Sequence, residues 1–294
     1  MNREVLKTEF IENLKQFSQS LREYVSTPDN QWTIKGFIDI FQNIYSISSD
    51  SKIVSKILEI HLFSKFLEFA NQHHFHLILA EKQNWYPDIS FVSKQDSTVK
   101  FAVDLKTTYR LQDKLGFCNG FTLGSHGTYF TERNSTKNIQ FPYSQYMAHC
   151  CLGILYSRNT LDFQEEAKVY RYYQQENLGT IPSVISEFEF FACEKWKIAS
   201  DKSGSGNTAN IGSISYIQDI LQERGIFSQL GESWFDEYWM NFGKIVCPNV
   251  VNTKGKLKAI TSLEEYLKFK GKDQDWINSH IPIRRSKGIL LHNG

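Results

Sequence analysis

The chain has 294 residues, of which 41% are hydrophobic and 22% charged, and its formal net charge is +1. These values are typical of a globular protein with a sizeable core, and they exclude collagen-like, disordered and coiled-coil chains. No run of about eighteen apolar residues is present, and the charged N-terminus lacks the apolar segment of a signal peptide, so we expect an intracellular, cytoplasmic protein. The five cysteines form no CxxC pair, which favours reduced thiols over disulfides or a zinc site.

Two helices and then a group of strands are predicted for the first half of the chain. Apolar residues recur at helical spacing over residues 1–25 and again over residues 53–72. The buried side of the second helix is expected to carry Ile53, Ile57, Ile60, Phe63 and Phe66. Short β-like segments then predict strands at residues 76–81, 88–92 and 99–109.

The second half of the chain mixes helix, strand and loop signals. Residues 144–156 are largely apolar and predict a buried helix, and residues 187–193 predict a further strand. Residues 203–213 are rich in Gly, Ser and Asn and predict a loop, and the last fifty residues are expected to form helices joined by turns. This order predicts an α+β (mixed α/β) protein, with a main domain over residues 1–245 and a basic helical extension of the same domain over residues 246–294.

Positive charge is concentrated near the C-terminus. Between Lys254 and Lys287 there are nine Lys or Arg residues against four acids. Such a stretch could bind phosphate groups. The simpler interpretation is a solvated basic face, and charge alone favours that interpretation.

The chain has two places where a Pro-Asp pair is followed by an acid-x-Lys pattern. The first combines Asp29 with residues 50–52, and the second combines Asp88 with residues 104–106. In the first, residue 50 lies in a polar stretch with nothing to hold a carboxylate in place, so we interpret that match as accidental. In the second, the acid and the lysine lie two positions apart on a predicted strand, where alternate side chains share one face.

The second combination points to chemistry on phosphodiesters. Asp88 precedes a neighbouring strand and can converge on Asp104 and Lys106, and two carboxylates on rigid strands suit Mg²⁺. A bound metal lowers the pKa of water and neutralises charge on a phosphoryl transition state. Lys106 would stabilise the phosphate, or orient the attacking water and help to deprotonate it. The alternative is a buried Asp–Lys ion pair with no catalytic role.

Four segments resemble the EcoRV-type restriction endonucleases, a family of type II enzymes in the PD-(D/E)xK superfamily. In chain order they are NWYPDISF, FAVDLKTTY, FTLGSHGTYFTERNSTKNIQFPYSQYMAH and SGSGNTANIGSI. The resemblance runs over residues 52–239, nearly two thirds of the chain. It implies the restriction-endonuclease-like fold, in which helices flank a central mixed β-sheet.

The resemblance also implies an activity. It implies a homodimer in the bacterial cytoplasm that uses Mg²⁺ to hydrolyse both strands of a short palindrome in double-stranded DNA, leaving 5′-phosphate and 3′-hydroxyl ends. The first expectation for the site is GATATC with blunt ends, and a cognate DNA methyltransferase is expected in the host. The N-terminal helix and residues 144–156 are the expected dimer contacts. The alternatives are a nuclease with another target or nicking activity, and a DNA-binding protein without catalysis.

Functional residues follow from the resemblance motif by motif. The implied catalytic residues are Asp88, Asp104, Lys106 and Glu59, of which the three acids are the implied metal ligands. The residues implied to read DNA bases are Gly204, Ser205, Gly206, Asn207, Thr208 and Ala209. The residues implied to contact the minor groove or the DNA backbone are Gln83, Asn84, Thr108 and Lys137. The family pattern has threonine at position 209 and histidine at position 85, where this chain has Ala209 and Trp85.

Overall fold

The computed structural model describes residues 2–82, 84–159, 172–173, 178, 181–204, 209–251, 255 and 257–281. Its helices are α1 (Arg3–Val25), α2 (Ser51–Gln72), α3 (Thr128–Thr131), α5 (Ile217–Leu221), α6 (Glu232–Asn241), α7 (Leu263–Phe269) and α8 (Gln274–His280), with short 3-10 turns η1 (Tyr143–Gln145) and η3 (Lys195–Ile198). Its strands are β1 (Gly36–Ile38), β2 (Ile44–Ser46), β3 (Phe75–Leu79), β4 (Ile89–Ser93), β5 (Lys100–Tyr109), β6 (Thr122–Ser125), β7 (Ala148–Arg158), β8 (Tyr172–Tyr173), β9 (Ile185–Glu194), β10 (Ala199–Ser203), β11 (Asn210–Ser213), β12 (Val246–Val251) and β13 (Leu257–Ala259).

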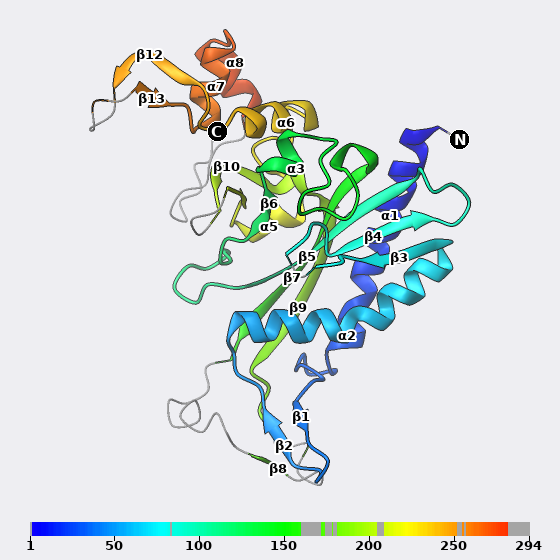
Figure 1. The fold of residues 1–294 in the computed structure, drawn as a ribbon. Coiled ribbons are helices and arrows are strands. Elements are labelled where there is room, and N and C mark those ends of the chain that lie inside the picture. Colours follow the sequence, from blue (N-terminus) through cyan, green and yellow to red (C-terminus); the bar gives the residue numbers. More distant parts are fainter. Residues whose placement is uncertain are drawn as a thin grey trace.

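A five-stranded mixed sheet forms the centre of the protein (Figure 1). Its strands lie in the order β3-β4-β5-β7-β9, and β5 and β7 are parallel while the other neighbours are antiparallel. Helices α1 and α2 pack on one face, where Phe10 of α1 stacks on Phe101 of β5 with ring centroids 3.9 Å apart. The expected mixed α/β architecture, with helices flanking a mixed sheet, is confirmed.

The opposite face of the sheet carries a second apolar core. A smaller sheet, in the order β10-β11-β6, packs there together with α3, α5 and α6. Residues of the C-terminal helices, among them Tyr266 and Ile277, belong to the same cluster as Phe130 and Trp239. The segment after residue 245 therefore shares its core with the main domain. Figure 1 shows this half of the protein at one end of the central sheet and the β1–β2 hairpin at the other.

The helix predicted for residues 144–156 is wrong. Most of that segment is β7, which pairs with β5 on one side and with β9 on the other. Residues 148–156 are all buried, because a central strand covered on both faces has no polar side. Its sequence is then a continuous apolar run, which periodicity does not separate from a buried helix. The segment is also buried within its own chain, and its expected place in a dimer contact gains no support.

Helix α2 lies where it was predicted, but its buried side differs. Ile57 and Phe66 are buried as expected, and Val54, Leu58 and Leu62 are buried with them. Ile53, Ile60 and Phe63 are instead 40%, 66% and 37% exposed. Apolar residues surround most of this helix, so their spacing did not decide which of two neighbouring faces is buried. Ile60 and Phe63 line a surface cavity instead, beside residues of the candidate site described below.

Several other segments refine the sequence reading. The N-terminal helix and the strands expected at 76–81, 88–92, 99–109 and 187–193 are confirmed by α1, β3, β4, β5 and β9. The segment 203–213 is not all loop, since it begins at the end of β10 and ends with β11. The C-terminal region contains the unexpected β12–β13 hairpin beside the expected helices. Among the described residues, no helix is long and apolar enough to cross a membrane.

Gly153 of β7 should tolerate no side chain. A Cβ at this position would collide with the aromatic ring of Phe191 on the neighbouring strand β9. We expect Gly153→Ala to lower the free energy of unfolding by about 1–3 kcal/mol, the usual cost of overpacking a core. Chemical denaturation measures this. Gly120→Ala is the control, because a Cβ there has no heavy atom within 4 Å, and equal stability of both variants would contradict the prediction.

Candidate active site

Strands β4 and β5 place two carboxylates side by side. The antiparallel register pairs Ile89 with Val103, so Asp88 and Asp104 occupy the next opposed positions. The backbone N–H of Leu105 donates to Asp88 Oδ2 at 2.7 Å, and the N–H of Asp88 points to Asp104 Oδ1 at 3.4 Å. Both side chains are thereby fixed by the backbone of the neighbouring strand.

Lys106 completes the group that the sequence predicted. Its Nζ lies 2.5 Å from Asp104 Oδ2, as alternate positions on one strand allow. Asp104 is buried and Lys106 is partly buried. Asp88, Asp104 and Lys106 therefore form one compact site.

The charges of this site are strongly coupled. Burial and the negative charge of Asp104 raise the pKa of Asp88 to about 7, although Lys106 and the N–H of Leu105 act in the opposite direction. Burial lowers the pKa of Lys106, but the charges of Asp104 and Asp88 outweigh it and hold that pKa above its usual value. Two adjacent carboxylates with only one cation leave an excess of negative charge.

The competing Asp29 and Asp50 match has local structural roles. Asp50 is the N-cap of α2, and its side chain accepts from the backbone N–H groups of Lys52 and Ile53. Asp29 lies in an exposed turn and accepts a hydrogen bond from the hydroxyl of Thr27. The interpretation of this match as accidental is consistent with both placements.

A cavity of about 270 Å³ adjoins Asp88 on the side of α2. Its walls include Asp88 and Leu105 from the sheet, and Glu59, Ile60 and Phe63 from α2. Glu59 is exposed and pairs with Lys56 at 2.8 Å. Glu59 and Asp88 thus face one cavity, but among the described residues no three acidic, histidine or cysteine side chains lie close enough to hold a metal ion together.

The donor chemistry of the pair fits a divalent cation. Asp88 and Asp104 offer carboxylate oxygens, which hard cations such as Mg²⁺ prefer, and the raised pKa of Asp88 reflects a repulsion that a cation would relieve. Asp88 and Asp104 would be the primary ligands. Glu59 would supply a third carboxylate from the opposite wall of the cavity.

The loop implied to read bases is held between β10 and β11. Of its residues, Gly204 and Ala209 are described, and Ser205, Gly206, Asn207 and Thr208 lie outside the described residues. The N–H of Gly204 donates to Asn210 O at 2.9 Å, and Ala209 O accepts from the N–H of His126 at 2.7 Å. The backbone at position 126 thus fixes one end of the loop, a contact that no sequence motif signalled.

The other implied DNA contacts lie in varied surroundings. Gln83 lies outside the described residues, and Asn84 is exposed on the turn before Tyr86. Lys137 is exposed in the segment after α3. Thr108 is 4% exposed, and its hydroxyl donates to Asn119 O, so this side chain joins β5 to the segment before β6.

The described part of the basic C-terminal segment is largely paired with acids. Lys258 pairs with Glu265, Lys268 with Glu264 at 2.8 Å, and Lys270 with Glu237 at 2.6 Å. Residues 282–294, which include Arg284, Arg285 and Lys287, lie outside the described residues. The described lysines therefore favour the solvated-face reading over a phosphate-binding strip.

Comparison with known proteins identifies the family of the chain. Residues 28–271 match the family model described as restriction endonuclease EcoRV. The chain is also 34% identical over 217 residues to the type II restriction enzyme EcoRV of Escherichia coli, an alignment that covers 73% of this chain and 84% of that enzyme. The carboxylate pair with its lysine lies inside the matched region. The protein therefore belongs to the EcoRV family of type II restriction endonucleases.

Proposed function

We propose that this nuclease uses Mg²⁺ to cut both strands of a short palindrome in double-stranded DNA, as a homodimer in the bacterial cytoplasm. The observation that carries the proposal is the Asp88, Asp104 and Lys106 group, in which backbone hydrogen bonds from adjacent strands orient the two carboxylates. A bound Mg²⁺ supplies charge neutralisation at the phosphate and lowers the pKa of its water. Within this proposal, Lys106 and the loop between β10 and β11 have separate roles.

Lys106 acts as a fixed positive charge. Its pKa is held above the usual lysine value, so at neutral pH the amine carries its proton and cannot accept another. Of its two expected roles, stabilisation of the negative phosphate therefore fits better than deprotonation of water. Its ion pair with Asp104 also aims the ammonium at the site where a phosphate would lie beside the carboxylates.

Base recognition is assigned to the loop between β10 and β11. Glycines at 204 and 206 let backbone groups approach the edges of bases in the major groove. We propose GATATC, cut to blunt ends, as the recognised site, because Gly204, Gly206, Asn207 and Thr208 keep the family pattern. Ala209 is the position at which the recognised sequence could differ. A methyltransferase that protects the same site is expected in the host.

Digestion of a fully sequenced plasmid tests the proposal. The enzyme is incubated with Mg²⁺ or with EDTA, and all ends are mapped by sequencing. Blunt double-strand cuts at GATATC that need Mg²⁺ would support the proposed metal, the cleavage of both strands and the assigned site. Cuts at another sequence would overturn the assigned site, nicks in one strand would overturn two-strand cleavage, and binding without cleavage would favour a silent DNA-binding protein.

The β1–β2 hairpin supports the proposed homodimer. Ile40 is 90% exposed and Phe41 is 77% exposed at its tip, although both are large apolar residues. The turn is rigid, because Asp39 Oδ1 accepts from the backbone N–H groups of Phe41 and Asn43, each at 2.9 Å. An ordered, exposed apolar surface on a single chain is typical of an interface. A second copy would cover it and give one active site for each DNA strand.

Charging the hairpin tip should separate the subunits. We expect the double variant Ile40→Lys/Phe41→Lys to weaken self-association at least about 100-fold, since central apolar contacts dominate such interfaces. Analytical ultracentrifugation measures this, and double-strand cleavage should fall in parallel. Leu115→Lys, which changes a residue that is 96% exposed elsewhere, is the control. A double variant that sediments as a dimer would refute this interface.

A further inference from the structure

Lys195 is a buried lysine whose amine has no polar partner. It is the first residue of η3, between β9 and β10, and it is only 3% exposed. Within the part of the chain that the structure describes, its Nζ makes no hydrogen bond. Three aromatic rings surround the amine instead: those of Tyr143, Tyr86 and Phe130, with centroids 4.7, 4.9 and 5.3 Å away.

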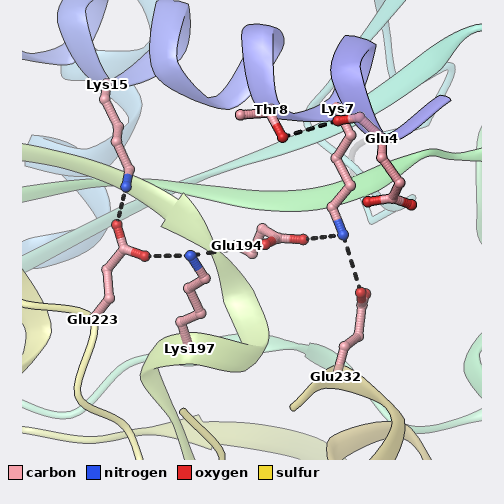
Figure 2. Close-up of polar contacts among 8 residues, drawn as sticks. All are labelled: Glu4, Lys7, Thr8, Lys15, Glu194, Lys197, Glu223 and Glu232. Atoms are coloured by element: carbon pink, nitrogen blue, oxygen red, sulfur yellow. Dashed lines mark hydrogen bonds and ion pairs between the residues drawn. The ribbon is translucent and has the colours of Figure 1, made fainter. Parts of the chain in front are cut away.

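The nearest charged residues in the sequence, Glu194 and Lys197, do form ion pairs (Figure 2). Glu194 forms an ion pair with Lys7 of α1 at 2.6 Å, and Lys197 forms one with Glu223 at 2.7 Å. Lys15 of α1 also reaches Glu223. These ion pairs fix the outer side of η3 to α1. Of the two lysines of η3, only Lys195 has a buried side chain, although the carboxylate of Glu194 is directly adjacent in sequence.

An amine in this position is costly. Burial lowers the pKa of Lys195 to about 7, even though Asp104 and Asp236 act to raise it. A buried polar group without a hydrogen bond destabilises a fold, and a methionine would fill a similar volume without that cost. Buried polar groups are normally hydrogen-bonded, and exceptions such as this amine are expected at functional sites.

The rings around Lys195 lead to the catalytic carboxylates. Tyr86 stands two residues before Asp88, and its hydroxyl lies 3.0 Å from Nδ1 of the buried His149. Its ring stacks on that of Tyr129 at 5.3 Å. The backbone N–H of Tyr86 donates to Asn138 O at 3.1 Å. The Lys195 amine also lies over this ring, so a movement of η3 would be felt by the turn that ends in Asp88.

The same 3-10 turn leads into the base-reading loop. Residue 198 ends η3, residue 199 begins β10, and β10 ends at Ser203, one residue before Gly204. The N–H of Ile214, just beyond β11, donates to Ile198 O at 2.9 Å, so both ends of this hairpin are joined to η3. One short rigid segment therefore connects the loop with the packing around Tyr86.

We propose that Lys195 is a positioning residue that links the base-reading hairpin to the turn carrying Asp88, through its contact with the Tyr86 ring. The proposal rests on the proposed nuclease function and adds a route by which the recognised sequence affects catalysis. A shift of β10 upon correct base contact moves η3, and Lys195 transmits that shift to the Tyr86 ring. Misplacement of a reacting group by about 1 Å can cost about 100-fold in rate, so small movements suffice.

The test is the variant Lys195→Met, compared with Lys197→Met on the same turn. Both are assayed for kcat and KM on a cognate duplex and on a duplex with one altered base pair, and DNA binding is measured separately in EDTA. We expect Lys195→Met to lower kcat on the cognate duplex about 10- to 100-fold with little change in KM. Its preference for the cognate duplex should shrink. Lys197→Met should cleave like the wild type, because Lys7 still holds Glu194.

The outcomes separate this proposal from the nuclease function itself. Wild-type and Lys197→Met cleavage establishes the nuclease, whatever Lys195→Met does. Unchanged kinetics of Lys195→Met, or an equal loss on both duplexes, would overturn the link. If Lys195→Met does not fold, Lys195→Gln is assayed on the same two duplexes in its place. A wild-type protein that cleaves no DNA would remove the proposed function and this proposal with it.

Discussion

Asp104→Asn should abolish DNA cleavage while the protein still folds and binds DNA. Asparagine keeps the volume of the side chain, but it removes one of the two adjacent carboxylates and the partner of Lys106. Loss of a metal ligand at the reacting phosphate removes stabilisation that we expect to be worth at least about 10³-fold in rate. Single-turnover cleavage of a cognate duplex measures the rate, and a gel-shift assay in EDTA measures binding.

Asp50→Asn is the matched control for this variant. Asp50 belongs to the rival Pro-Asp and acid-x-Lys match, yet it caps α2, and asparagine is an equally good N-cap. We expect this control to cleave at the wild-type rate. Cleavage by Asp104→Asn within tenfold of the wild type would remove Asp104 from the catalytic group. Loss of cleavage by Asp50→Asn would mean that the wrong triplet was chosen.

Lys195→Met should stabilise the fold, and the gain should depend on pH. The folded-state pKa of Lys195 is about 7, below the value of 10.5 for an unperturbed lysine. Between these pH values the unfolded chain binds more protons than the folded one, so this residue makes the wild type more stable as the pH rises. The destabilisation is fully present below pH 7 and disappears toward pH 10.5. A shift of this size corresponds to up to about 5 kcal/mol.

The difference in stability between Lys195→Met and the wild type isolates this effect. Other groups that titrate in the same range are common to both proteins and cancel. The charged groups that act on the Lys195 amine are Asp104, Asp236, Arg133 and Glu232. Denaturant unfolding of both proteins at pH 7 and pH 9.5 should show the larger gain at pH 7. A gain that is absent, or equal at the two pH values, would mean that the amine is not destabilised by burial.

The placement of Asp88, Asp104 and Lys106 beside one another could be predicted because it depends on short-range geometry. Residues two apart on a strand share a face, so Asp104 and Lys106 could be paired from the sequence, and β4 brings Asp88 beside them. The choice between two equal motifs was also possible, since only one lay in a β-like segment. The resemblance to a known family then supplied the family's activity, which spacing alone did not.

Features that depend on packing between distant segments could not be predicted. β7 resembled a helix because both of its faces are buried, and the buried side of α2 was predicted only for Ile57 and Phe66 because apolar residues surround most of the helix. Lys195 carries no motif, and its environment arises only when β9, η1 and the turn before Asp88 come together. The segment around Ile40 has the apolar sequence of a buried strand. Its exposure could not be predicted, because only the folded structure shows which apolar segments lie at the surface.

The exposed hairpin has a consequence for the timing of DNA damage in a cell. If two copies must join through Ile40 and Phe41 before both strands can be cut, newly made chains remain harmless until their concentration approaches the dissociation constant. Single chains accumulate linearly, whereas at low concentration pairs accumulate with the square of the concentration. A monomeric methyltransferase produced at the same time would thus gain a head start on the chromosome, and cutting would begin after the host's own sites were protected.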